Sequence, residues 1–267
     1  MIKSMLGRTR RQLLRFKRQN RLPLVTGAAA YVWYQWRNAH DLLHMGDVRR
    51  EIAAGVPADV EGQVAFVMDR FGGAVRPIQD RHEISELVRR VRAQAPLTVL
   101  EIGTARGGTL FLLCQAAHEA ATIISLDLPF GRNGGGFPRW KEKTYRTFAR
   151  PGQRLVLLRG NSHAPASLAA VEAVLAGRKL DFIMIDGDHS YEGVRQDYET
   201  YSRLLAPGGV IALHDVLPNR TDPSIDVSRF WAEIAARHDS EEIIHDADQG
   251  HLGIGLVRPA GRAPAAA

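Results

Sequence analysis

Residues 97–117, LTVLEIGTARGGTLFLLCQAA, carry the clearest structural pattern in this chain. An apolar run ends at Glu101, a glycine-rich turn follows over 103–108, and a largely apolar helical segment comes next. Glycine adopts backbone angles that other residues avoid, so this turn can be tight. A strand, a tight turn and a helix in this order predict the opening unit of a nucleotide-binding β-α-β array.

The same alternation continues downstream and predicts the class of fold. Helical segments separate five apolar runs, which favours a parallel sheet with right-handed crossovers. The final stretch EEIIHDADQGHLGIGLVRP has no helix between its two apolar runs, so we expect a hairpin that turns at Asp246–Gly250. The predicted fold is α/β, a doubly wound and mostly parallel sheet with a C-terminal antiparallel hairpin. Its parallel strands are expected near residues 97–102, 121–127, 154–159, 180–186 and 209–214.

The remaining segments predict how the chain is organised around this sheet. Residues 61–95 have helical periodicity and stop at Pro96. The stretch PFGRNGGGFPRW, residues 129–140, is too rich in Gly and Pro for regular structure and suits a flexible substrate lid. A further helical face is formed by Val194, Tyr198, Tyr201 and Leu205 and ends at Pro207. We expect a basic and aromatic extension over 1–60, a domain over 61–259 with its cofactor-binding core at 97–215, and a disordered tail over 260–267.

The positive charge of the chain is concentrated at one end. Residues 1–21 hold eight Lys/Arg and no acid, which leaves 27 basic residues (35 minus 8) against 29 acidic ones elsewhere. A nucleic-acid-binding fold needs a basic face on the domain itself, so we expect no nucleic-acid partner. The only cysteine, Cys114, cannot form an intrachain disulfide, and no apolar run is long enough to span a membrane.

Acidic and histidine side chains follow the predicted strands at their carboxyl ends, where parallel sheets bind ligands. Asp127 lies 26 residues after Glu101 and ends the second strand, a position from which an acid accepts hydrogen bonds from both ribose hydroxyls. A NAD(P)-binding fold would share these features. However, the glycine spacing here is G-x-x-x-G-G, whereas the pyrophosphate-binding pattern is G-x-G-x-x-G.

A divalent metal site is predicted where two neighbouring strands end. Strands at 180–186 and 209–214 would lie ~4.8 Å apart, so Asp186 can share an ion with His214 and Asp215. Two carboxylates with water oxygens suit Mg²⁺. An imidazole ligand would shift the preference toward Mn²⁺, Fe²⁺ or Zn²⁺.

The start E-x-G-x-x-x-G-G resembles the first motif of class I S-adenosylmethionine-dependent methyltransferases, and the PGGV strand entry at 207–210 is similar to theirs. The resemblance runs from about Ile78 to Val257. It is closest to the subgroup of cephalosporin-hydroxylase-like proteins and macrolide sugar O-methyltransferases, through IQDRHEI, VLEIGTARGGT, LLRGNSH and IDGDHSYEGV. It implies that the cofactor is lined by Glu101, Gly103, Thr104, Gly107, Asp127, Asn161, Ser162 and Asp186.

Two positions depart from the pattern of that family. The turn after the third strand carries Asn161 where an acid usually helps to hold the adenine, and His214-Asp215 stand where the sugar O-methyltransferases have Glu-Asp. The resemblance also assigns the catalytic base to His189, beside Asp186. In the alternative interpretation, this D-G-D-H segment only caps the following helix through Asp188 or Ser190.

The resemblance implies methyl transfer from S-adenosylmethionine to a hydroxyl of a small molecule or sugar, including a sugar on a glycolipid, with metal assistance. Two alternatives stay open. One is a metal-independent methyltransferase on the same fold, and the other is a degenerate cofactor-binding scaffold recruited by its basic N-terminus. His245 and His251 flank the terminal hairpin and are expected at the surface.

The N-terminal extension has three interpretations. Met5, Leu6, Leu13, Leu14 and Phe16 alternate with arginines as in a basic amphipathic helix, and two tryptophans and two tyrosines follow within 22–36. Residues 1–36 could contact the inner face of a membrane peripherally, or form a lid or homo-oligomer interface. A twin-arginine export signal is disfavoured because FKRQNR precedes any apolar run, so we expect a cytoplasmic protein, soluble or membrane-peripheral.

Overall fold

The computed structural model describes residues 24–129 and 136–259. Three expectations therefore lie outside the described residues: the amphipathic helix near the N-terminus, the middle of the predicted lid, and the disordered tail. Within the described part of the chain, no helix is long and apolar enough to cross a membrane.

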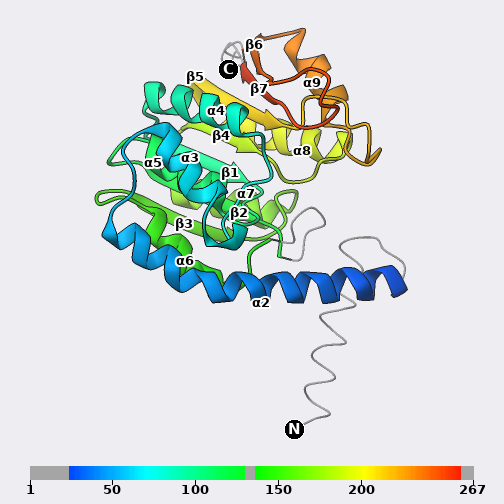
Figure 1. Ribbon diagram of the computed structural model, residues 1–267. Coiled ribbons are helices and arrows are strands. Elements are labelled where there is room, and N and C mark those ends of the chain that lie inside the picture. The colour runs from blue at the N-terminus through cyan, green and yellow to red at the C-terminus, as the bar shows by residue number, and fades with distance from the viewer. Residues whose placement is uncertain (1–23, 130–135, 260–267) are drawn as a thin grey trace.

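A seven-stranded sheet with the order β3-β2-β1-β4-β5-β7-β6 forms the centre of the molecule (Figure 1). The first five strands are parallel, and β7 runs antiparallel to both β5 and β6. This arrangement confirms the predicted fold class, including the terminal hairpin. The strands are β1 Thr98–Ile102, β2 Thr122–Asp127, β3 Arg154–Arg159, β4 Leu180–Ile185, β5 Leu205–His214, β6 Asp239–Ile243 and β7 Ile254–Arg258.

Helices cover both faces of the sheet (Figure 1). One apolar core lies under α3, α4 and α5, and the other under α7, α8 and α9. Every residue of β1 and β2 is buried, as expected for strands enclosed on both faces. The helices are α2 Leu24–Ala54, α3 Val60–Met68, α4 Arg81–Gln94, α5 Gly108–Ala116, α6 Glu142–Tyr145, α7 Pro165–Leu175, α8 Tyr191–Tyr201 and α9 Val227–Ala235, with short 3₁₀ turns η1 Phe71–Gly73, η2 Arg139–Lys141, η3 Arg146–Phe148 and η4 Ser202–Leu204.

The predicted helix that included Leu205 was too long. Helix α8 ends at Tyr201, a 3₁₀ turn follows, and Leu205 already belongs to β5, where it pairs with Leu180. Leu205 packs against the same core as α8. Its apolar side chain therefore continued the helical pattern although its backbone is extended.

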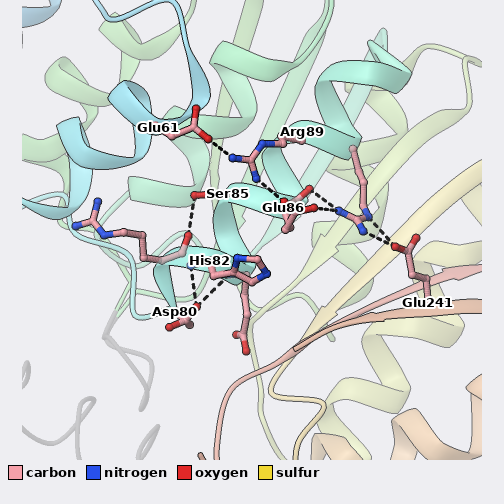
Figure 2. A network of polar contacts seen from close by, with 10 residues as sticks. Glu61, Asp80, His82, Ser85, Glu86, Arg89 and Glu241 are labelled. Atoms are coloured by element: carbon pink, nitrogen blue, oxygen red, sulfur yellow. Dashed lines mark hydrogen bonds and ion pairs between the residues drawn. The ribbon is translucent and has the colours of Figure 1, made fainter. Parts of the chain in front are cut away.

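Helix α4 is fixed to its neighbours by charged side chains on its outer surface (Figure 2). Arg89 pairs with Glu86 and with Glu61 of α3, and Arg90 bonds Glu241 of β6 with an Nε–Oε1 distance of 2.8 Å. At its start, the Asp80 side chain accepts hydrogen bonds from the backbone N–H groups of the first turn. These contacts hold α4 against both α3 and the terminal hairpin.

The 31-residue helix α2 lies along the β3 side of the molecule (Figure 1). Its inner face buries Tyr31 and Tyr34, and the buried Asp41 carboxylate lies 2.6 Å from Nζ of Lys141 in η2. The opposite face leaves apolar side chains in solvent: Val32, Trp33, Trp36, Leu42 and Leu43 are each more than half exposed. The two tyrosines are thus part of the body, whereas the two tryptophans lie on the surface.

Candidate active site

The turn after β1 is built against the end of β4. Gly103 has φ 93°, and a Cβ there would lie 1.9 Å from the carbonyl oxygen of Asp186. Only glycine allows this approach, which places the turn beside one of the predicted site residues. Gly107 and Gly108 also lie against protein atoms, because a Cβ would meet the Tyr145 ring at 2.7 Å and the Val75 carbonyl oxygen at 2.3 Å, respectively.

Glu101 lies at the bottom of this turn with its side chain fully buried. Thr104 Oγ1 donates to Glu101 Oε2 at 2.6 Å and lies 2.6 Å from Ser125 Oγ. The second carboxylate oxygen, Oε1, has no hydrogen-bond partner among the described residues. Burial raises the pKa of Glu101 well above its ordinary value. A buried acceptor without a donor suits the ammonium group of an amino-acid ligand.

Asp127 closes the other side of the turn. The backbone N–H of Ala105 donates to Asp127 Oδ2 at 2.7 Å. Burial raises the pKa of Asp127 to about 7, although hydrogen bonds from the backbone of Ala105, Leu128 and Thr104 oppose the shift. The carboxylate therefore lies at the carboxyl end of β2, as the sequence predicted, and it titrates near neutral pH.

The turn after β3 is held by its own polar groups. Gly160 N–H donates to the Asp127 carbonyl at 2.9 Å, and Asn161 Oδ1 accepts from the backbone of His163 at 3.1 Å. The Ser162 carbonyl accepts from the Tyr201 hydroxyl at 2.9 Å. Asn161 and Ser162 thus stand next to Asp127. Their predicted contact with an adenine stays a prediction.

Two histidines and two aspartates meet where β4 and β5 end. His189 Nδ1 lies 2.5 Å from Asp215 Oδ2, and its Nε2 lies 3.5 Å from Asp186 Oδ1. His214 Nδ1 lies 3.2 Å from Asp186 Oδ1 and 3.6 Å from Asp215 Oδ1. The sequence placed all four residues at neighbouring strand ends, and the fold brings their side chains into one cluster.

Attraction between the histidines and the aspartates sets the direction of the pKa shifts in this cluster. Burial would lower the pKa of His214, but the charges of Asp186 and Asp215 raise it well above the ordinary value. The pKa of His189 is also raised, because its hydrogen bond to Asp215 and the charge of Asp186 outweigh burial. The reverse holds for Asp215, whose pKa is lowered by both histidines despite burial.

Asp215 also has a strained backbone, with φ 62° in a residue other than glycine. Such strain concentrates at functional sites, where the surrounding structure maintains it. The strained residue directly follows β5, and its carboxylate contacts His189.

Three residues lie close enough to hold a metal ion together, and two of them belong to the predicted set. One ligand atom each from Asp186, His189 and Asp215 lie within 4.8 Å of one another, a spacing that fits a divalent ion. His214 is not in that group, although it lies against both carboxylates. Both imidazoles thus lie against the carboxylates, and the predicted metal set of Asp186, His214 and Asp215 stays a prediction.

Helix α8 is capped by Ser190, one of the two residues considered for that role. Ser190 Oγ accepts from the Gly193 N–H at 3.1 Å, and Asp188 Oδ1 accepts from the Ser190 N–H at 3.0 Å. The His189 side chain is directed to Asp215 instead. The cap of α8 therefore does not need His189, which leaves its imidazole available for chemistry.

Sequence reasoning missed Tyr145 and the charged residues beneath the cofactor turn. The Tyr145 hydroxyl donates to the Ala105 carbonyl at 3.2 Å, and Arg106 Nη2 lies 4.0 Å from the buried Asp41. These contacts join segments 40 or more positions apart. Local periodicity carries no signal for such pairs.

Part of this chain is similar in sequence to a known protein family. Residues 100–216 match the model of a family described as a methyltransferase domain. This segment of the chain is thus similar to a methyltransferase domain. The matched segment begins in β1 and ends just after Asp215, so it includes the turn after β1 and the cluster at the ends of β4 and β5.

Whole-protein similarities are more distant. An uncharacterized protein of Sinorhizobium fredii, y4gI, is 28% identical over 66% of this chain, which spans only 19% of that protein. An O-methyltransferase from Bacillus cereus, solved with SAH, superposes with TM-score 0.53 at 22% identity, covering 73% of this chain and 90% of its own. TomG, an O-methyltransferase from Streptomyces achromogenes solved with SAM, gives TM-score 0.54 at 16% identity over 76% and 90%. These likenesses show that the chain has a Rossmann-like methyltransferase fold.

Proposed function

We propose that this protein transfers a methyl group from S-adenosylmethionine to a hydroxyl of a small molecule or a sugar. The observation that carries the proposal is the cluster of Asp186, His189 and Asp215 at the carboxyl edge, beside the glycine-rich turn of a methyltransferase domain. The similar folds that were solved with SAM or SAH, both O-methyltransferases, support the donor and the hydroxyl acceptor.

The cofactor would lie along the turns after β1, β2 and β3. Glu101 Oε1 would accept from the ammonium of the methionine half, and Asp127 from the ribose hydroxyls. Asn161 and Ser162 would border the adenine of the cofactor. A ligand held by several fixed groups keeps its methyl carbon in line with the acceptor oxygen, and such positioning supplies much of the rate of a methyl transfer.

His189 would act as the general base. Its Nδ1 is held by Asp215, which fixes the ring orientation and stabilises the imidazolium after proton uptake. Its Nε2 faces Asp186, on the open side of the cluster. The acceptor hydroxyl would give its proton to this nitrogen as its oxygen bonds to the methyl carbon.

The carboxylates of Asp186 and Asp215 would hold a divalent ion, of which Mg²⁺ suits oxygen ligands best. When bound, such an ion lowers the pKa of a coordinated hydroxyl. The close His189–Asp215 contact favours a rival proposal, in which the same fold transfers the methyl group without metal and His189 is activated by Asp215 alone.

Substitution of His189 separates these proposals from the scaffold alternative. We expect His189→Ala to lose turnover by at least about a hundredfold, the usual contribution of a general base. Binding of S-adenosylmethionine, measured by calorimetry, should stay unchanged. Unchanged turnover would contradict the base, and no cofactor binding by the wild-type protein would favour the scaffold.

A chelator distinguishes metal-assisted from metal-independent methyl transfer. If a metal assists, EDTA should abolish turnover, and Mg²⁺ or Mn²⁺ should restore it. Asp186→Asn should remove that metal response without unfolding the protein, because Asp186 lies at the partly open edge of the cluster. Turnover that is indifferent to EDTA would support the metal-independent reaction.

The outer face of α2 favours a peripheral membrane contact as a second element of function. Its exposed side chains include Trp33, Trp36 and Leu43, and Arg37 stacks against the Trp33 ring. Eight cations precede this helix in residues 1–21. An apolar, aromatic helix face next to a basic segment suits an anionic bilayer surface. A glycolipid acceptor would be presented at that surface. A homo-oligomer that buries the same face is the competing proposal.

A further inference from the structure

A hollow lies at the carboxyl edge of the sheet, the edge that also carries the His–Asp cluster. It has a volume of about 240 Å³ and is lined by Arg76, Ile78, Gln79, Arg106, His251 and Leu252. Its two walls come from opposite sides of that cluster. Arg106 belongs to the turn after β1, and the Leu252 carbonyl accepts from Leu217 N–H at 2.9 Å, two residues beyond Asp215. Since β4 lies between β1 and β5, the hollow lies at the same edge of the sheet as Asp186.

The walls of this hollow are fixed by buried contacts. The Glu83 carboxylate accepts from Gly253 N–H at 3.0 Å and from Gln249 Nε2 at 2.7 Å, which holds the loop before β7. Arg106 Nη1 donates to the Gly73 carbonyl at 2.8 Å. The hollow is therefore built by the fold on both sides, and a ligand would not have to order it.

The electrostatics of the hollow favour an anion. Arg76 and Arg106 both line it, and no Asp or Glu does so among the described residues. Arg76 is exposed and has no ion pair in the part of the chain that the structure describes. A guanidinium presents paired donors that match a carboxylate or a phosphate. The His–Asp cluster has the opposite character, with its two carboxylates.

Gln79 adds a requirement for a hydroxyl. Its side chain is 7% exposed, and its Nε2 donates to Thr109 Oγ1 at 3.3 Å. Gln79 also lines the hollow, and its Oε1 is buried without a hydrogen-bond partner among the described residues. A buried acceptor without a donor destabilises the protein. A ligand hydroxyl would provide the missing donor.

We propose that this hollow binds the carboxylate or phosphate of a small, polyhydroxylated acceptor, with Arg76 and Arg106 on the anion and Gln79 on a hydroxyl. The inference rests on the proposed function, because it places the methylated hydroxyl of the same molecule at the cluster of Asp186 and His189. The hollow is smaller than the roughly 300–1,000 Å³ of sites for drug-sized ligands. Its volume suits one sugar unit with an acidic group.

Calorimetric titration of the full-length protein saturated with S-adenosylhomocysteine tests this inference. The probes are D-glucuronate, inorganic phosphate and neutral D-glucose. We expect glucuronate and phosphate to bind and glucose to bind more weakly. Arg76→Gln should raise the Kd of both anions by about threefold or more. Gln79→Met should weaken the binding of glucuronate. It should leave the binding of phosphate unchanged, because phosphate does not need the amide oxygen. Arg154→Gln, with the same charge change at an exposed site on β3, should leave both unchanged.

Each other outcome has a definite meaning. If neither anion binds, or if Arg76→Gln and Arg154→Gln behave alike, the inference is wrong. If Arg76→Gln weakens S-adenosylhomocysteine instead of the anions, the hollow holds the carboxylate of the cofactor and not the acceptor. Failure of the wild-type protein to bind S-adenosylhomocysteine would overturn the proposed function. Anion binding by the protein alone would still be measured in that case, so the two failures are distinguishable.

Discussion

At the scale of single residues, burial raises the pKa of Glu101 and Asp127 at the carboxyl edge, whereas attraction between opposite charges sets the pKa shifts of the His–Asp cluster. Asp127, Glu101 and the His–Asp cluster all lie in or near the interior, where each charge depends on its partners. For Asp127, burial exceeds the effect of three backbone donors, so its pKa rises to about 7. A group that changes charge near neutral pH makes the affinity for its ligand depend on pH.

Cofactor affinity should therefore follow the ionisation of Asp127. The ribose hydroxyls need the carboxylate form, so the Kd for S-adenosylmethionine should be constant above about pH 8. It should rise toward tenfold per pH unit well below pH 7, the behaviour of one required deprotonated group. Calorimetry from pH 5.5 to 8.5 measures this. The Asp127→Asn variant should bind S-adenosylmethionine more weakly, and its Kd should not depend on pH. A pH dependence that survives in that variant would assign the titration to another group.

At the scale of elements, one buried ion pair attaches α2 to the body. Asp41 is fully buried, and Lys141 is 2% exposed with its Nζ 2.6 Å from Asp41 Oδ2. Burial lowers the pKa of Lys141 to about 8 although Asp41 opposes the shift. Desolvation thus outweighs attraction, and the pair contributes more to the placement of α2 than to net stability.

Removal of one member of this ion pair should therefore lower the free energy of unfolding more than removal of both. Lys141→Met leaves the Asp41 carboxylate buried without its closest partner, so we expect a loss of about 3–5 kcal/mol in the free energy of unfolding. The double variant Asp41→Leu, Lys141→Met should recover part of that loss. Urea unfolding of the four proteins of this cycle gives the comparison. Equal and additive losses would show that the two side chains act independently.

At the scale of the whole molecule, the exposed face of α2 is the largest departure from an ordinary surface. Val32, Trp33, Trp36, Leu42 and Leu43 are each at least 57% exposed along one helix. Contiguous exposed apolar surface of this kind marks an interaction site. The basic residues before α2 make an anionic membrane the favoured partner.

Vesicles that contain phosphatidylserine should therefore sediment with the protein, and neutral vesicles should not. Salt should weaken the association, because screening reduces the attraction between exposed charges. Trp36→Ser or Leu43→Ser should lower the partition coefficient by about tenfold, the value of one buried apolar side chain. Leu97→Ser, at an exposed site off the helix, is the matched control. A dimer in sedimentation that does not bind vesicles would assign the face to a second copy.

The sequence by itself determined the sheet, because strand and helix periodicity and glycine turns are local properties that persist in the fold. The β1 turn, the β2 acid and the charged ends of β4 and β5 were predictable for the same reason. Only the tertiary structure decided that His189 joins His214 beside the two carboxylates, with a ring nitrogen close enough to theirs to share an ion. It alone placed Gln79 and Arg106 in one hollow and divided the aromatic residues of α2 between core and surface. Each of these outcomes depends on contacts between distant segments, and local spacing holds no information about such contacts.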